Sequence, residues 1–312
     1  MSIGNFIVLV YVLLYIGALA LAVKQRKTFP LMDSLMVILI IGGAFTGLVY
    51  LATLPVKATP IKSTPSTTEL AFTFGYLILV TILLVIRPST KADNSFFKKQ
   101  LAAIAFKLPV FVLIPLAILK LVWNTSWSDF GFSMGDMRGQ LIAVAILIPL
   151  FGGFNYIAGS AAAPLRKRQF SDKWIVLGLG ISFLWNILET GLVEEFFFRA
   201  FLQTRLINTL GSPLAGICLT SLLFGLAHAP GIYLRSGDKD GPLGEKPSLL
   251  NSILYGIIVL SPAGWFTGLL YWQTQSLLAP ILVHASIDAV AHAVDFIKWM
   301  KKTEVETQPT LR

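Results

Sequence analysis

The sequence predicts an all-α, polytopic membrane protein with about eight or nine transmembrane helices. Hydrophobic residues make up 55% and charged residues only 13% of the 312 residues, whereas soluble domains carry about 25% charged residues. Several apolar stretches reach the roughly 20 residues that an α-helix needs to cross the hydrocarbon core. None of these stretches alternates polar and apolar residues as a transmembrane β-strand does.

Nine apolar segments are candidate helices. They cover residues 3–23, 31–54, 70–86, 101–123, 139–158, 174–192 with a continuation, 212–228, 251–272 and 277–297. The first segment is not typical of a cleavable signal peptide, because no basic residue precedes it and its apolar run is too long. The fourth is the least typical membrane helix, because it contains Lys107 and Lys120.

The basic residues predict the orientation of the chain. They concentrate in every second connection, namely Lys24/Arg26/Lys27, Arg87/Lys91/Lys98/Lys99, Arg166/Lys167/Arg168/Lys173, Arg235/Lys239/Lys246 and Lys298/Lys301/Lys302. Under the positive-inside rule the N-terminus is non-cytoplasmic and the C-terminus cytoplasmic, in the plasma membrane if the source is prokaryotic. Topology therefore explains the net charge of +9. No basic face indicates nucleic-acid binding, so the predicted partners are the lipid bilayer and a protein or peptide substrate.

We divide the chain into N-terminal transmembrane helices (1–138), a helix bundle that carries the chemistry (139–297) and a polar cytoplasmic tail (298–312). Up to about residue 100 the segments contain few polar residues, with Asp33 near a helix end as the exception. The Gly/Pro-rich stretch 229–247 is interpreted as a solvated connector, with a mobile lid as the alternative. The single cysteine, Cys218, excludes an internal disulfide and a cysteine-based metal cage, and is interpreted as a small buried hydrophobe.

A first polar cluster interrupts the sixth segment. Glu195 and Arg199 are four residues apart, so they share a helix face and are predicted to form an ion pair. Glu194 points about 100° away and must face something else, which suits a general base. Glu189 and Asn186, one and two turns earlier, could line the same cavity. The structural alternative is that both carboxylates of the pair only neutralise basic residues.

Two further clusters follow in other apolar segments. Phe224 and His228 are four residues apart at a helix end, where a lone histidine is more often a cap than a catalyst. His284 and Asp288 share a face of the last segment, so the aspartate could orient the imidazole or join it as a metal ligand. His292 continues this face and is interpreted as a hydrated interfacial residue. Ionisable groups at membrane depth usually pair, line a cavity or do chemistry, so an active site enclosed by the C-terminal helices is expected.

Together these motifs, Glu-Glu-x-x-x-Arg, Phe-x-x-x-His and His-x-x-x-Asp in that order, resemble those of the CAAX-protease and bacteriocin-processing (CPBP) family. The family includes prenyl-protein endopeptidases of the Rce1 type, and the resemblance spans roughly residues 139–295. It implies an intramembrane glutamate-type endopeptidase acting on a membrane-associated or lipidated protein or peptide. By resemblance, Glu194 and His228 activate the attacking water, and His284 and Asp288 hold the oxyanion. Glu195, Arg199 and Phe224 support them.

The resemblance implies no required metal or cofactor, and no serine or cysteine nucleophile motif competes for the role. A zinc site built from Glu194, His228, His284 and Asp288 is the alternative, since carboxylate and imidazole are suitable ligands. The prenyl-protease members carry Asn where this chain has Asp288. An ionised aspartate cannot donate to an oxyanion, so it would be protonated or would hold His284 in its donating tautomer. Two other functions stay open, a non-catalytic immunity or scaffold protein and a transporter with a proton relay.

Overall fold

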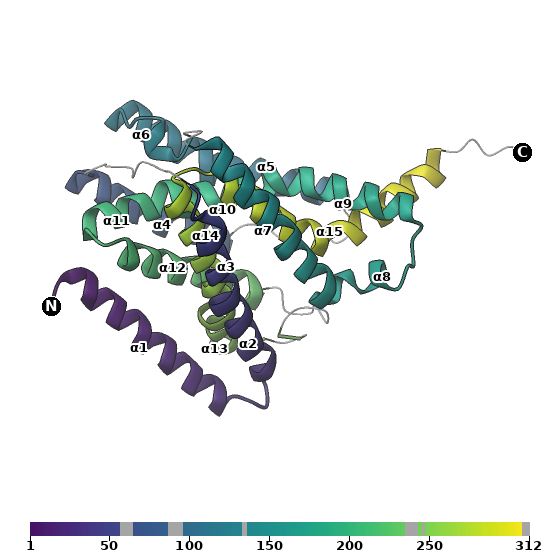
Figure 1. Ribbon diagram of the computed structural model, residues 1–312, viewed down its shortest axis with the longest axis horizontal. Helices are drawn as coiled ribbons and strands as arrows, with labels where there is room; N and C mark the ends of the chain where they lie inside the picture. The colour runs from purple at the N-terminus through teal and green to yellow at the C-terminus, as the bar shows by residue number, and fades with distance from the viewer. Residues whose placement is uncertain (57–64, 87–95, 133–135, 235–242, 245–246, 308–312) are drawn as a thin grey trace, which may run out of the picture.

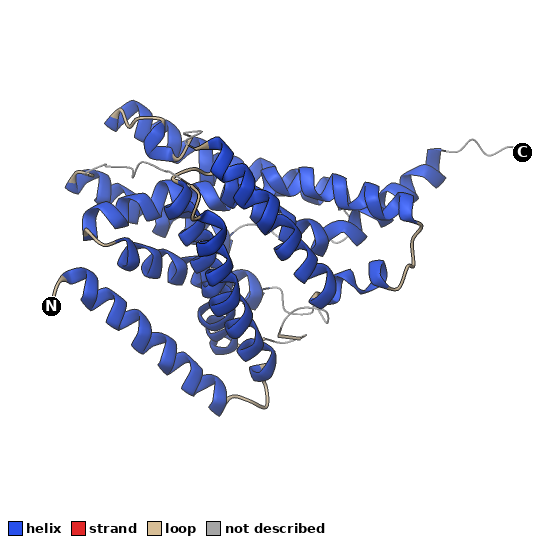
Figure 2. Ribbon diagram, viewed as in Figure 1, coloured by secondary structure: helices blue, strands red, loops and turns tan. Residues whose placement is uncertain are grey.

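The computed structural model describes residues 1–56, 65–86, 96–132, 136–234, 243–244 and 247–307 (Figure 1). In these ranges the chain consists of helices and short connections, without a strand (Figure 2). Nine of the described helices are long and apolar enough to cross a membrane. The predicted class, an all-α multi-pass membrane protein, is confirmed.

Each crossing is either one helix or several consecutive elements, of which η1, η2, η5, η6 and η7 are π-helical. The first half of the chain contains α1 (Ile3–Lys24), α2 (Leu31–Val37), η1 (Ile38–Phe45), α3 (Thr46–Thr53), α4 (Thr67–Ile86), α5 (Phe96–Leu108), η2 (Pro109–Leu113), α6 (Ile114–Trp123), the 3₁₀ turn η3 (Ser128–Phe130) and α7 (Met137–Ala158). The second half contains the 3₁₀ turn η4 (Ser160–Ala162), α8 (Ala163–Arg166), α9 (Asp172–Asn186), η5 (Ile187–Leu192), α10 (Val193–Glu195), η6 (Phe196–Gln203), α11 (Thr204–Leu210), α12 (Pro213–Leu234), α13 (Leu249–Tyr255), η7 (Gly256–Leu260), α14 (Ser261–Thr274) and α15 (Leu278–Thr307).

All nine predicted segments lie in membrane-length helices, and three of the helices extend further than expected. The sixth runs without interruption from Asp172 to Leu210. Helix α12 continues to Leu234, so interpreting the whole of 229–247 as a connector was wrong for its first six residues. Pro230 is tolerated there, because helix-breaking residues occur in membrane helices when neighbouring groups satisfy the freed backbone. Helix α15 continues to Thr307, through most of the segment predicted as a polar tail.

Helix α15 crosses the middle of the bundle and packs against α7 and α9, whereas α12 packs against α14, η7 and α11. Helix α1 lies at the edge of the bundle in Figure 1, where it contacts α12. The start of α1 and the end of α15 lie far apart along the long axis of the molecule (Figure 1). Basic residues in 57–64, 87–95, 235–242 and 245–246 lie outside the described residues, and the in–out orientation stays a prediction.

Two glycines allow the helices that carry the polar clusters to approach closely. A Cβ atom on Gly225 would collide with the backbone carbonyl of Gly256, so α12 and η7 touch through their main chains. A Cβ atom on Gly191 would lie 2.7 Å from the carbonyl oxygen of Ile281, at the start of α15. Small residues permit such backbone contacts between membrane helices. These contacts bring the ends of α12 and α15 towards the Glu-Glu pair of α10.

Candidate active site

The Glu-Glu pair lies on a short α-helical turn between two π-helical segments. Glu194 and Glu195 belong to α10, with η5 before them and η6 after them. In a π-helix the backbone hydrogen bond spans five residues, which widens the turn and redirects side chains, and such bulges are frequent at functional sites. Here the distortion lies on both sides of the residues that the sequence identifies as candidates for catalysis.

Glu195 and Arg199 form the predicted ion pair. The Nε atom of Arg199 donates to Oε2 of Glu195 at 2.9 Å, and both side chains are 0% exposed. The guanidinium also donates to Thr267 Oγ1 at 2.6 Å and to Gln203 Oε1 at 3.5 Å. These four residues form a buried network, in which every charge has a partner. Such pairing is required at membrane depth, where an unpaired ion is costly.

Glu195 has a second partner that the sequence did not predict. Its Oε1 atom lies 2.6 Å from Nδ1 of His284, which comes from α15. Because Glu195 also accepts from Arg199, it acts as a carboxylate, and Nδ1 of His284 is the donor. This bond fixes the orientation of the His284 ring. The residue that holds His284 through Nδ1 is therefore Glu195, whereas Asp288 lies on the other side of the ring.

Glu194 faces away from the buried network, as its position on the helix predicts. Its Oε2 atom lies 3.7 Å from Nε2 of His228 and 3.9 Å from Nε2 of His284. The same His284 nitrogen lies 3.6 Å from Oδ2 of Asp288. The structure thus brings all four candidate catalytic residues together from three helices, and we call them the open cluster. Distances of this length are not direct hydrogen bonds, and a water can bridge such groups.

The hydrogen bond of the His228 ring determines which of its nitrogens is available. Nδ1 lies 2.8 Å from the carbonyl oxygen of Phe224, one turn earlier on α12. A carbonyl only accepts, so Nδ1 carries the proton, and in the neutral ring Nε2 has the lone pair. Phe224 also packs its ring 4.8 Å from the His228 ring and beneath the Arg199 guanidinium, at 5.4 Å. Phe224 therefore supports both clusters through its backbone and its ring.

The three consecutive phenylalanines of η6 are packing residues. Phe196, Phe197 and Phe198 are at most 2% exposed. They contact different neighbours, since the ring of Phe196 stacks on Phe130 and that of Phe198 packs edge-on against Phe224. Their main role is therefore aromatic packing between helices.

Three polar residues near the motifs have partners outside the open cluster. Glu189 pairs with Lys107 of α5 at 3.2 Å, between Nζ and Oε1. Asn186 bonds to Ser182 within α9. His292 is half-buried and its Nδ1 lies 3.3 Å from Oδ1 of Asn186. Interpreting His292 as a hydrated interfacial residue was therefore incomplete, because α15 turns this ring towards α9.

Sequence reasoning missed two long-range ion pairs. Arg205, on α11, donates through Nε to Glu69 of α4 at 2.8 Å, and both residues are buried. Glu69 lies one residue before the predicted segment 70–86 and belongs to the first turn of α4, so naming Asp33 as the exception in the first hundred residues was wrong. Asp33 itself lies exposed in the first turn of α2. The other missed pair is that of Lys107 with Glu189. Glu189 thereby neutralises one of the two lysines that made the fourth segment atypical. The available signal was a charged residue in or close to an apolar segment with no oppositely charged residue at helical spacing.

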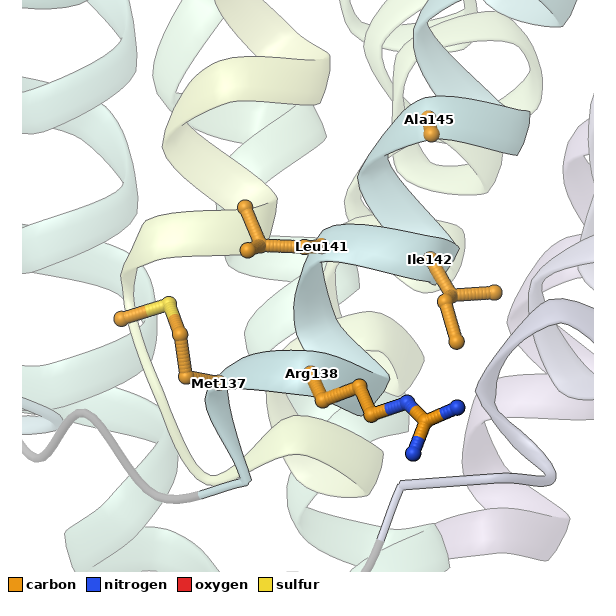
Figure 3. Close-up of a pocket in the computed structure, with 5 residues that line it drawn as sticks. All are labelled: Met137, Arg138, Leu141, Ile142 and Ala145. Atoms are coloured by element: carbon orange, nitrogen blue, oxygen red, sulfur yellow. The ribbon is translucent and has the colours of Figure 1, made fainter.

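Among the described residues, no group of three His, Cys, Asp or Glu side chains is placed to hold a metal ion. Cys218 is buried and free, as predicted. A hollow of about 660 Å³ lies on the outer side of the bundle, at the N-terminal end of α7 (Figure 3). Its lining residues are Met137, Arg138, Leu141, Ile142 and Ala145. None of them belongs to the open cluster, so this hollow is separate from the candidate site.

A protein-family model matches part of the chain. Residues 176–290 match the model of a family described as type II CAAX prenyl endopeptidase Rce1-like. This segment is Rce1-like. The predicted resemblance is thereby confirmed over a range that contains the Glu-Glu pair, His228, His284 and Asp288, although α7 lies outside it. No curated protein and no solved structure matches the chain.

The Rce1-like match covers less than half of the chain, and the description of the matched family is that of a prenyl endopeptidase of the CAAX type. The nine apolar helices are consistent with this, since they make the chain an integral multi-pass membrane protein. The expected surroundings of the site are therefore a lipid bilayer and a peptide substrate.

Proposed function

We propose that the Rce1-like segment is an intramembrane endopeptidase of the glutamate type, hydrolysing a peptide bond of a membrane-associated or lipidated protein or peptide. The observation that carries the proposal is the position of the Glu194 carboxylate. It faces the Nε2 atoms of two histidines at 3.7 and 3.9 Å and has no cationic lysine or arginine as a partner among the described residues. A carboxylate held in this way is available for proton transfer.

Water activation follows from the hydrogen bonds around His228. Glu194 is an acceptor, and His228 presents a lone pair at Nε2 because its Nδ1–H donates a hydrogen bond to the carbonyl oxygen of Phe224. A water between them donates one proton to each, and its oxygen lone pair then points away from both, towards a substrate carbonyl. When the water oxygen attacks the substrate carbonyl, a proton of the water passes to Glu194 and His228. They return it to the leaving amine when the peptide bond breaks.

His284 and Asp288 hold the oxyanion in this scheme. Glu195 accepts a hydrogen bond from Nδ1–H of His284, so Nε2 is the nitrogen that faces the open cluster. Three carboxylates surround this ring, those of Glu194, Glu195 and Asp288, and we propose that it acts as a cation with a proton on Nε2. A preorganised charged donor stabilises developing negative charge strongly where water is scarce. Asp288 then stabilises the cation, or donates directly when it is protonated.

The mechanism proposed here uses no bound metal, since its proton transfers and its oxyanion donor are supplied by side chains. We further propose a non-cytoplasmic N-terminus and a cytoplasmic C-terminus. The basic residues at the ends of α1, α8 and α15 support this orientation.

The experiment that tests the function compares protein termini in cells that express wild-type protein or Glu194→Gln at matched membrane levels. Asp33→Asn is the matched control, because it makes the same chemical change at an exposed site outside the bundle core. Termini present with wild type and Asp33→Asn but absent with Glu194→Gln would establish proteolysis and identify a substrate. Identical termini in all three, with an unchanged phenotype, would favour a non-catalytic scaffold.

A further inference from the structure

The ion pair between Lys107 of α5 and Glu189 of η5 joins α5 to the long helix that carries Glu194, and it has no role in the mechanism above. Its two side chains are 22% and 10% exposed. Lys107 occupies one oxygen of Glu189, and the indole Nε1 of Trp185 donates to the other at 3.1 Å. Trp185 also contacts Gln100 Oε1 at 3.2 Å, so α5 and α9 are connected by a chain of polar contacts. Glu189 is therefore held in place, and it fixes Lys107 in turn.

Lys107 is more exposed than Arg199 and Arg205, the two buried arginines of the long helix from Asp172 to Leu210. In the described part of the chain, Arg199 and Arg205 are at most 1% exposed and their donors are committed to protein acceptors. Lys107 is partly exposed and makes a single hydrogen bond to a described residue, although an ammonium has three donors. An anion that enters the site can reach the charge of Lys107 but not those of the two arginines.

The position of Lys107 relative to Glu194 suits the end of a peptide substrate. Glu189 precedes Glu194 by five residues in one continuous helix. Along the helix axis this corresponds to a rise of at most about 7 Å, since an α-helix rises roughly 1.5 Å per residue and the π-helical η5 rises less. The segment η2, which begins two residues after Lys107, packs against α10. An extended peptide advances roughly 3.3 Å per residue, so a tail of a few residues spans this separation.

We propose that Lys107, held by Glu189, binds the free C-terminal carboxylate of the substrate. The proposal rests on the endopeptidase function above. A carboxylate is costly at membrane depth, and Glu194 and Asp288 repel it, so its entry requires a nearby cation. The Lys107 ammonium can donate to a second carboxylate while keeping its hydrogen bond to Glu189.

The test uses the purified full-length protein and a peptide ending in a prenylated Cys-a-a-X tail, prepared once with a free carboxylate and once with a C-terminal amide. Wild type is expected to prefer the carboxylate by about tenfold or more in kcat/KM, mainly through KM, as for a hydrogen bond to a charged group. Lys107→Gln alone would leave Glu189 unpaired. The double variant Lys107→Gln/Glu189→Gln avoids this, and it should cleave both peptides at a similar rate.

Two variants separate recognition from structure. Glu189→Gln removes the competing carboxylate but keeps the cation, so the preference for the free carboxylate should be retained or increase. Lys120→Gln removes a lysine of the same membrane segment that bonds to the Thr125 carbonyl, and it should behave as wild type. Equal cleavage of both peptides by wild type, or an unchanged preference for the free carboxylate in the double variant, would contradict the proposed role of Lys107. Neither outcome would contradict the protease activity. No cleavage of either peptide by wild type would contradict the proposed protease activity and this inference together.

Discussion

The buried network and the open cluster are adjacent in sequence and space, yet their charges are arranged in opposite ways. In the buried network Glu195 and Arg199 are 0% exposed and bonded at 2.9 Å. In the open cluster the side chains are 12–35% exposed and their charged atoms stay 3.6–3.9 Å apart. We infer that short ion pairs between fully buried side chains stabilise the bundle, whereas the wider spacing of the open cluster leaves room for water and substrate. His284 connects the two, with one nitrogen in each.

The largest expected effect belongs to the open cluster. Replacing His228 by Ala removes half of the proposed base, so kcat/KM should fall by roughly 10²- to 10⁴-fold. The side chain is 35% exposed and bonds only to the backbone of its own helix, so the unfolding midpoint should change little. Kinetics with a cleavable peptide and a thermal melt in the same detergent provide both measurements. Full activity of this variant would contradict the role of His228.

Glu195→Ala tests the buried network. It leaves Arg199 charged and unpaired, which should destabilise the protein by about 3–5 kcal/mol, and it releases the His284 ring, so activity should fall as well. The double variant Glu195→Gln/Arg199→Met should recover most of the stability but little of the activity. Chemical unfolding and peptide kinetics measure the two effects. Recovery of both together would mean that Glu195 has no part in positioning His284.

The second buried pair sharpens the contrast, because it lies away from the open cluster. Glu69→Ala leaves Arg205 without its carboxylate partner and should cost about 3 kcal/mol of stability, as for other broken buried pairs. The two backbone carbonyls that Arg205 also contacts moderate this loss. The kcat of the folded fraction should equal that of wild type. A selective loss of kcat would show that α4 affects the chemistry.

A smaller effect is expected for Asp288→Asn. The amide has the same size, can donate to an oxyanion and is not needed to hold His284, which Glu195 fixes. Activity should change by less than about fivefold, whereas Asp288→Ala should lose more, since Ala can neither donate nor stabilise the His284 cation. A pH–rate profile of each variant distinguishes the roles. A large loss in Asp288→Asn would indicate that the negative charge itself is required.

The smallest effect should come from removing metal ions. If the side chains alone activate water, prolonged treatment with a chelator should leave kcat/KM unchanged, and added Zn²⁺ should not increase it. Activity lost on chelation and restored by Zn²⁺ would replace the glutamate mechanism with a metalloprotease mechanism at the same residues. Metal analysis of the purified protein is the accompanying measurement.

The fold and the identities of the candidate site residues were largely predictable. Hydropathy located all nine crossings, because a helix in lipid must be long and apolar whatever its neighbours are. Helical periodicity also separated Glu194 from Glu195, since adjacent residues point about 100° apart. Helix ends were less predictable, as α12 and α15 continue into polar sequence that helix contacts stabilise.

From the amino-acid sequence alone we could predict the class, about eight or nine crossings, the motif residues and the pair between Glu195 and Arg199, all of which depend on composition and local spacing. Only the tertiary structure decided that Glu195 holds His284, that Lys107 meets Glu189 and that Arg205 meets Glu69, across separations of 82 to 136 residues. A charge in an apolar segment indicates that a partner exists but not where. The packing of the helices selects the partner, because it decides which interior faces meet.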